Sequence, residues 1–215
     1  MKKKLYIITN ESFYLKENSF FCDNIDLKVI PEELGKYFEI CIIGRKSKKP
    51  RTKKIEIKDA KIFSNIIFYL FFLIKSLLRK NNDYLIISIS PYTFFSSVIL
   101  KIFFKKHFIY LRSDGYEEYE AIYGFFGKLI YHIMFNVAAL KASLISCRKH
   151  ILKSKIGKIV HPSQLNEKWF EPPKSLDFNK IKLLYVGRIK VEKGIYSLLK
   201  MIKDSDIKLT IVTAE

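Results

Sequence analysis

Short, continuously apolar runs recur along most of the chain and constrain its fold more than any other feature. The strand-length runs are residues 5–9, 38–43, 84–90, 107–111 and 143–146, with a shorter one at 55–57. Helical-length segments lie between them at residues 31–37, 60–79, 93–104 and 122–141, and residues 10–26 are expected to form a loop. A strand without polar alternation is buried on both faces. The pattern therefore predicts an α/β protein, with a Rossmann-like parallel sheet covered by helices on both faces.

A proline-bearing segment divides the chain. Residues 161–180 hold three of the six prolines and the single tryptophan, and we interpret them as a linker. Residues 1–160 are then the first Rossmann-like domain. Residues 181–215 are strand, helix and strand again, which predicts the first βαβ unit of a second Rossmann-like domain, incomplete in this chain.

The charge restricts the partners without choosing among them. The net charge is +18 and the isoelectric point is near 9.7, which favours anionic ligands, anionic lipid surfaces or nucleic acid. The lysines are scattered, so a solvated lysine-rich surface explains the charge equally well. Nucleic acid is disfavoured because the aromatic residues fall in apolar runs and lysine far outnumbers arginine, the residue that reads bases.

Cysteine and histidine usage predicts no metal centre. Cys22, Cys41 and Cys147 are widely spaced, there is no C-x-x-C motif, and the four histidines lack ligand spacing. Free cysteines favour a reducing, cytoplasmic location. The apolar run at residues 62–74 is shorter than the roughly 20 residues that span a bilayer. A buried or interfacial helix is expected there, which leaves the inner face of the plasma membrane as a location and an anionic membrane surface as a partner.

The stretch at residues 185–202 has the make-up of a phosphate-binding half-site. An apolar strand ends at Gly187, Arg188 and Lys193 flank a short loop, and Gly194 precedes a helical pattern. Two cations and a helix start complement a diphosphate well. An ordinary strand-to-helix loop with solvated cations explains the same residues.

The segment VGRIKVEKGI, residues 186–195, resembles the start of the C-terminal domain in retaining GT-B glycosyltransferases. The resemblance implies that Arg188 and Lys193, with Gly187 at the turn, hold the diphosphate of a nucleotide-sugar donor and stabilise the leaving nucleotide without a metal or other cofactor. It implies a glycan or lipid-linked acceptor, in bacterial surface polysaccharide assembly. The family's paired glutamates have no counterpart before Glu215, so we expect negligible transferase activity from these 215 residues alone.

Residues after the other strands are candidates for the acceptor side of this site. The resemblance implies that Asp114, in LRSDGYEEYE at residues 111–120, orients an acceptor hydroxyl or the donor sugar; an acidic first turn of a helix explains it as well. Arg112, Asn10, Glu11 and Ser90 follow predicted strands and are expected to line the same cleft. The family's glycine-rich turn after the first strand is missing.

A non-catalytic basic protein that binds an anionic membrane or nucleic acid is the alternative. A continuous cationic stripe on one face would favour it, whereas cations facing a cleft would favour the enzyme. A nicotinamide-dependent enzyme is disfavoured because no G-x-G-x-x-G follows the first strand.

Overall fold

The computed structural model describes residues 2–78, 81–161, 182–187, 189 and 194–213. The chain divides into two compact units, residues 1–162 and 163–215. The division falls at the segment that the sequence predicts as a linker, residues 161–180, of which all but His161 lie outside the described part.

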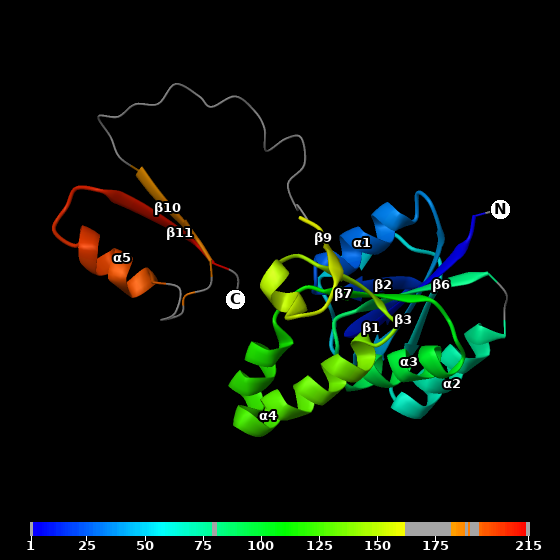
Figure 1. The fold of residues 1–215 in the computed structure, drawn as a ribbon. Helices are drawn as coiled ribbons and strands as arrows, with labels where there is room; N and C mark the ends of the chain where they lie inside the picture. The colour runs from blue at the N-terminus through cyan, green and yellow to red at the C-terminus, as the bar shows by residue number, and fades with distance from the viewer. Residues whose placement is uncertain (1, 79–80, 162–181, 188, 190–193, 214–215) are drawn as a thin grey trace. The chain divides into compact units, whose positions relative to one another are not determined.

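The first unit alternates strands and helices (Figure 1). Its strands are β1 (Lys4–Lys16), β2 (Ser19–Cys22), β3 (Glu39–Lys46), β4 (Lys53–Ile55), β5 (Ala60–Phe63), β6 (Asn82–Ile87), β7 (His107–Leu111), β8 (Ser143–Ser146) and β9 (Gly157–Ile159). Its helices are α1 (Asp26–Leu34), α2 (Ile66–Leu77), α3 (Pro91–Ile102) and α4 (Gly115–Ala139), with the 3-10 helix η1 (Lys149–Leu152).

The sheet is mostly parallel, which confirms the predicted fold class. β1 pairs in parallel with β3 on one side and β6 on the other, and the parallel order runs β5-β3-β1-β6-β7-β8-β9. The far end of β1 extends past this core and pairs antiparallel with β2, which pairs antiparallel with β4. β1 is therefore the strand from which the chain winds outward in both directions.

Each face of the sheet carries its own apolar core, because successive side chains of a strand point to opposite faces. Leu5 and Ile7 of β1 pack in one cluster with Leu27 of α1. Tyr6 and Ile8 pack in the other, with α2, α3 and α4. Figure 1 shows α1 on one side of the sheet and the other three helices on the opposite side. Helices thus cover both faces, as the apolar runs predict.

Two local predictions are wrong. Residues 10–26 are not a loop: they complete β1 and form β2 and the start of α1, and Glu17 and Asn18 have positive φ at the hairpin turn. Residues 60–79 are not one helix. β5 takes the first four residues, and α2 begins after Asn65, whose side chain accepts a hydrogen bond from the Ile67 backbone N–H at 2.7 Å.

α4 begins earlier than the apolar pattern predicts. Asp114 caps it, and Gly124 interrupts it at φ 63° and ψ −153°, a conformation that only glycine adopts readily. Gly127 lies where the chain returns on itself, since an added Cβ would stand 2.2 Å from the Tyr119 carbonyl oxygen. The helix is therefore kinked.

The second unit has two described strands and one helix. β10 (Lys182–Val186) pairs in parallel with β11 (Lys208–Val212), and α5 (Ile195–Ile202) connects them, which is the predicted βαβ unit. Gly194 precedes α5 at φ 71°, and Ile195 is its buried residue. Other apolar side chains of the unit, Leu184 and Val186 among them, are exposed.

Candidate functional site: a cavity at the carboxyl edge of the sheet

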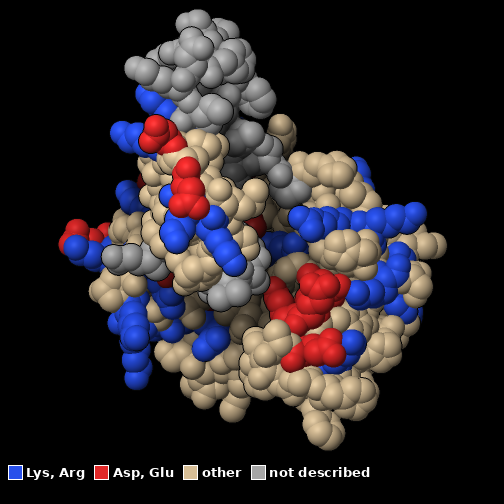
Figure 2. Space-filling view, turned by 90° about the vertical axis from the view of Figure 1, so that its left-hand side faces the viewer, with Lys and Arg blue, Asp and Glu red and all other residues tan. Residues whose placement is uncertain are grey.

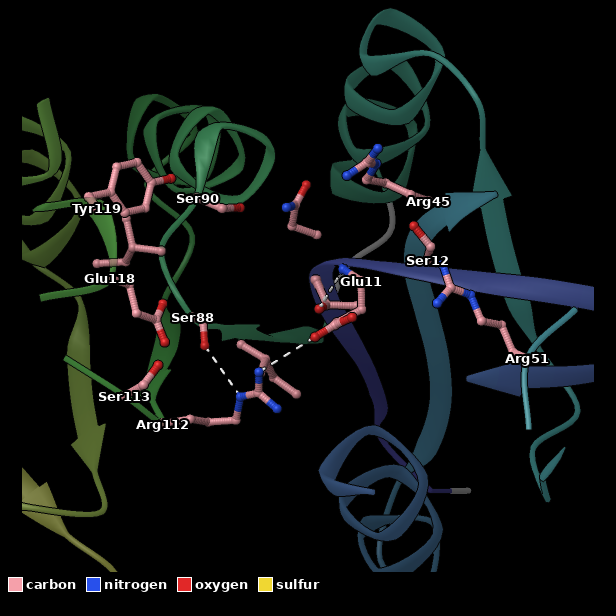
Figure 3. Close-up of a pocket in the computed structure, with 14 residues that line it drawn as sticks. Glu11, Ser12, Arg45, Arg51, Ser88, Ser90, Arg112, Ser113, Glu118 and Tyr119 are labelled. Atoms are coloured by element: carbon pink, nitrogen blue, oxygen red, sulfur yellow. Dashed lines mark hydrogen bonds and ion pairs between the residues drawn. The ribbon is translucent and has the colours of Figure 1, made fainter. Parts of the chain in front are cut away.

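A cavity of about 340 Å³ opens where the chain reverses its winding direction, beyond the carboxyl ends of β1 and β6. Open parallel sheets bind their ligands at such a position. The lining residues come from the ends of β1, β3, β6 and β7, the loop before β4, and the start of α4 (Figure 3): Thr9, Asn10, Glu11, Ser12, Arg45, Arg51, Ile87, Ser88, Ile89, Ser90, Arg112, Ser113, Glu118 and Tyr119.

An irregularity in β1 places Asn10 and Glu11 in this cavity. The register of β1 against β3 shifts between Ile8 and Ser12, so the residues between them leave the regular ladder. Beyond the shift, Ser12 pairs with Arg45. Gly44 makes this approach possible, because a Cβ there would lie 2.4 Å from the buried ring of Phe13. The packing of Phe13 on Gly44 thereby fixes Ser12 and Arg45 side by side.

A tight turn after β6 presents Ser88 and Ser90. Ser88 has φ +60°, and its carbonyl oxygen accepts a hydrogen bond from the Thr93 hydroxyl at 2.8 Å. That hydroxyl also accepts from the Ser90 backbone N–H at 2.8 Å, which completes a capping box at the start of α3. With Pro91 at the first position, the N-terminus of α3 lies at the cavity.

Arg112 ties three elements together at the floor of the site. Its guanidinium lies 3.6 Å from Glu11 Oε1 of β1 and 3.3 Å from Asp26 Oδ2 of α1. Its Nε donates to Ser88 Oγ at 3.4 Å, and Glu11 also accepts from the Asn24 side-chain amide at 3.0 Å. The dashed contacts in Figure 3 show Arg112 reaching across the cavity from β7. Its charge is therefore balanced by two carboxylates.

Arg45 and Arg51 form the opposite wall with Ser12 (Figure 3). Arg51 pairs with Asp23, and its Nε donates to Ser47 Oγ at 3.2 Å. Arg45 instead lies 5.3 Å from the ring centre of Tyr92, at the start of α3. Within the described part of the chain, Arg45 has no carboxylate partner.

Three further side chains can recognise ligand hydroxyls. Asn10 Oδ1 is buried and, among the described residues, accepts no hydrogen bond. A buried acceptor without a donor is costly, so this oxygen is suited to a donor from a ligand. Tyr119 and Glu118 face the cavity from α4. Burial raises the pKa of the Tyr119 phenol, which therefore stays protonated at neutral pH and can donate.

The structure brings four of the predicted residues together: Asn10, Glu11, Ser90 and Arg112 all line this cavity. Asp114 is not among the lining residues. Its buried carboxylate accepts from the Tyr116 backbone N–H at 3.0 Å and pairs with Lys153. These contacts favour the capping interpretation over an acceptor-binding role. Sequence reasoning missed Arg45 and Arg51, which follow the predicted end of a strand and stand in a basic run.

The predicted donor site is described only at Gly187. Its backbone N–H donates to the Val212 carbonyl at 3.0 Å and extends the pairing of β10 with β11, so that N–H is not free for a phosphate. Arg188 and Lys193 lie outside the described residues.

The described residues show neither a metal-binding group nor a membrane-spanning helix. Among the described residues, no group of three or more His, Cys, Asp and Glu side chains is placed to hold a metal ion. In the same residues, every helix is too short or too polar to cross a bilayer. Comparison with known protein families gives no match, and comparison with curated proteins gives none either.

Proposed function

We propose that this chain carries the acceptor side of a nucleotide-sugar-dependent glycosyltransferase of the retaining GT-B type. The cavity at the reversal point of the parallel sheet is the observation that supports it most. It collects arginine, carboxylate, amide and hydroxyl groups, which are the partners that a polyhydroxylated acceptor needs. In this proposal Asn10, Glu11, Ser90 and Arg112 bind the acceptor.

The second unit contributes the donor side in the same proposal. Arg188 and Lys193 bind the diphosphate of the nucleotide sugar and stabilise the charge that develops on the leaving nucleotide. The order of elements around them, β10 and then α5, is the order in which a strand and a helix N-terminus hold a phosphate. No metal or other cofactor is required in this scheme, because the two cations neutralise the diphosphate.

The donor half can be tested without knowing the acceptor. Uridine, guanosine and adenosine diphosphates are each added to the 215-residue chain and the melting temperature is recorded. At 100 times its Kd, the correct nucleotide is expected to stabilise the unit it binds by about 2.7 kcal/mol. Arg188→Ala and Lys193→Ala should remove this gain, whereas Lys200→Ala, in the last turn of α5, should retain it. If no nucleotide raises the melting temperature of the chain, the proposal is contradicted.

A second candidate function, binding to an anionic membrane surface, is favoured by a separate observation. The helices α2, α3 and α4 expose many large apolar side chains, which we call the apolar helix face: Ile67, Phe68, Phe71, Phe95, Ile102, Ile122, Tyr123, Phe125, Phe126, Ile130 and Ile133. Phe125 and Phe126 are 72% and 74% exposed. Extensive apolar exposure on helices that pack against one another is typical of an interaction surface. α2 buries Tyr69 and Leu73 while exposing Phe68, so it is both a core helix and a surface one.

Lysines supply the electrostatic part of this candidate. Lys75, Lys101 and Lys128 belong to the same three helices. On the side that Figure 2 shows, Lys and Arg side chains lie among uncharged and acidic ones. In this candidate the mode of binding is apolar insertion supported by lysines of the same helices.

Co-sedimentation with vesicles tests the membrane candidate. The chain is expected to bind phosphatidylglycerol-containing vesicles. Replacing Phe125 and Phe126 by serine together should weaken binding at least about 100-fold, because burying each apolar side chain contributes about 1.5–3 kcal/mol. Ile156→Ser is the control, since Ile156 is 98% exposed but lies outside these helices. Equal binding by the Phe variant and the control variant would contradict a role for this face.

A further inference from the structure

The basic side chains that line the cavity are all arginines. The chain has six arginines among 39 basic residues, and three of the six, Arg45, Arg51 and Arg112, line this one cavity. No lysine is among its described lining residues. A general excess of positive charge would bring lysines here, as it does elsewhere on the surface. A guanidinium differs from an ammonium in offering a planar fork that matches a carboxylate or phosphate with two parallel hydrogen bonds.

The three arginines are not equivalent. Arg112 is balanced by Glu11 and Asp26, as described above, and acts as a cross-link between elements. Arg51 uses part of its guanidinium to bind Asp23 and Ser47. Arg45 keeps its whole fork available, since its described contact is the face of the Tyr92 ring. The positive charge left over in the cavity is therefore concentrated at Arg45, with Arg51 on the same wall.

The other lining residues indicate which further groups a ligand of this cavity carries. Asn10 Oδ1 is a buried acceptor that requires a donor, and Ser12, Ser90 and Tyr119 are hydroxyl groups able to donate and accept. Glu118, exposed on α4, is a further acceptor. A volume of about 340 Å³ falls at the lower end of the range for ligand sites, about 300–1,000 Å³.

We propose that Arg45 and Arg51 form an oxyanion subsite, and that the ligand of this cavity is a hydroxyl-rich molecule bearing a carboxylate or phosphate. Arg45 binds the oxyanion with its free fork, held in place by Tyr92, and Arg51 adds its remaining N–H groups. Asn10 accepts a hydrogen bond from a ligand hydroxyl. The assignment rests on the proposed function only in calling this ligand the acceptor; the anion preference stands on the cavity itself.

The test compares three small ligands that share a sugar ring. Methyl β-glucuronide carries a carboxylate, glucose 6-phosphate carries a phosphate, and methyl β-glucoside carries neither. Dissociation constants are measured by NMR titration of the 215-residue chain. At least one anionic ligand is expected to bind ten times more tightly than the neutral one. Whichever anion is preferred identifies the oxyanion as carboxylate or phosphate.

Variants then show which arginine causes the preference for an anionic ligand. Arg45→Gln is expected to weaken binding of the preferred anion at least tenfold and to leave the neutral glucoside within twofold. Arg51→Gln should have a smaller effect of the same kind. Arg45→Lys, which keeps the charge but not the fork, should recover only part of the loss. Arg148→Gln removes an exposed arginine outside the cavity and should change nothing.

Two results overturn the proposal. One is a wild-type chain that binds both anionic ligands no better than methyl β-glucoside. The other is an anion preference that survives Arg45→Gln in a protein with unchanged melting temperature. Failure of the glycosyltransferase proposal is distinguishable from both, because it is recorded with nucleotides and the Arg188 and Lys193 variants.

Discussion

Replacement of Tyr69 by alanine is expected to lower the free energy of unfolding of the first unit by about 3–5 kcal/mol, the range for removing a buried aromatic side chain. The Tyr69 ring is fully buried in α2, and it meets Tyr92 edge-on with ring centres 5.2 Å apart. Its hydroxyl donates to the Thr9 carbonyl at 3.0 Å. The substitution thus leaves a cavity and removes the hydrogen bond of a buried carbonyl together.

Tyr69→Phe separates these two contributions, since it keeps the ring and removes the hydroxyl. About 1 kcal/mol is expected for this variant. Tyr37→Ala is the control, because Tyr37 is 72% exposed and its loss should cost at most about 0.5 kcal/mol. Urea unfolding followed by circular dichroism measures all three. If Tyr69→Ala costs no more than Tyr37→Ala, the packing of α2 against the sheet described here is wrong.

Arg112→Ala is expected to have the largest effect on ligand binding, a loss of about 100-fold in affinity for the preferred anionic sugar, or about 2.7 kcal/mol. Removing this guanidinium leaves Glu11 and Asp26 without their shared cation. The net charge around the cavity then falls by one, and the two carboxylates repel an incoming anion. The loss should exceed that of Arg45→Gln because the substitution both removes a cation and uncovers two anions.

Arg112→Lys and Arg112→Ala together separate charge from geometry. Lysine restores the charge but makes fewer of the contacts to β1 and α1. The Arg112→Lys chain should therefore bind about tenfold more tightly than the Arg112→Ala chain and still less tightly than the wild type. Arg148→Ala serves as the control for removing an arginine outside the cavity. NMR titration measures the affinities, and thermal melting shows that each variant is folded. If the Arg112→Ala chain binds the anionic sugar as tightly as the wild type does, Arg112 has no role in binding.

Much of the fold follows from the sequence because its strands are buried on both faces. The run at residues 84–90 has no polar alternation, and that property alone requires helices on both sides of β6. The strand β2 escapes prediction because it is four residues long, too short to show a period. The short strand predicted at residues 55–57 overlaps β4 only at Ile55, because β4 begins and ends two residues earlier. The break between β5 and α2 had a local signal in Asn65, a helix-capping residue inside an otherwise apolar stretch.

Some residues of the candidate site could be predicted from the sequence, and others could not. Asn10, Ser90 and Arg112 follow predicted strands, and parallel strands present their carboxyl ends at one edge, so their convergence is predictable. Arg45 is not, because its position depends on the shift in β1 and on Phe13 packing over Gly44. Neither the shift nor the contact has a sequence pattern of its own. Asp114 has two sequence interpretations, and the contact with Lys153 favours the capping one.

The central claim, that the cavity beside β1 and β6 binds an anionic acceptor while Arg188 serves the donor, is tested most directly by arginine Nε–Hε NMR spectra. Six arginines give six signals, assigned by Arg→Lys substitution one at a time. The preferred anionic sugar is predicted to shift the signals of Arg45, Arg51 and Arg112 and to leave Arg148 unchanged, and a nucleoside diphosphate is predicted to shift Arg188. An anionic-sugar shift at Arg148 with none at the three cavity arginines would contradict the account.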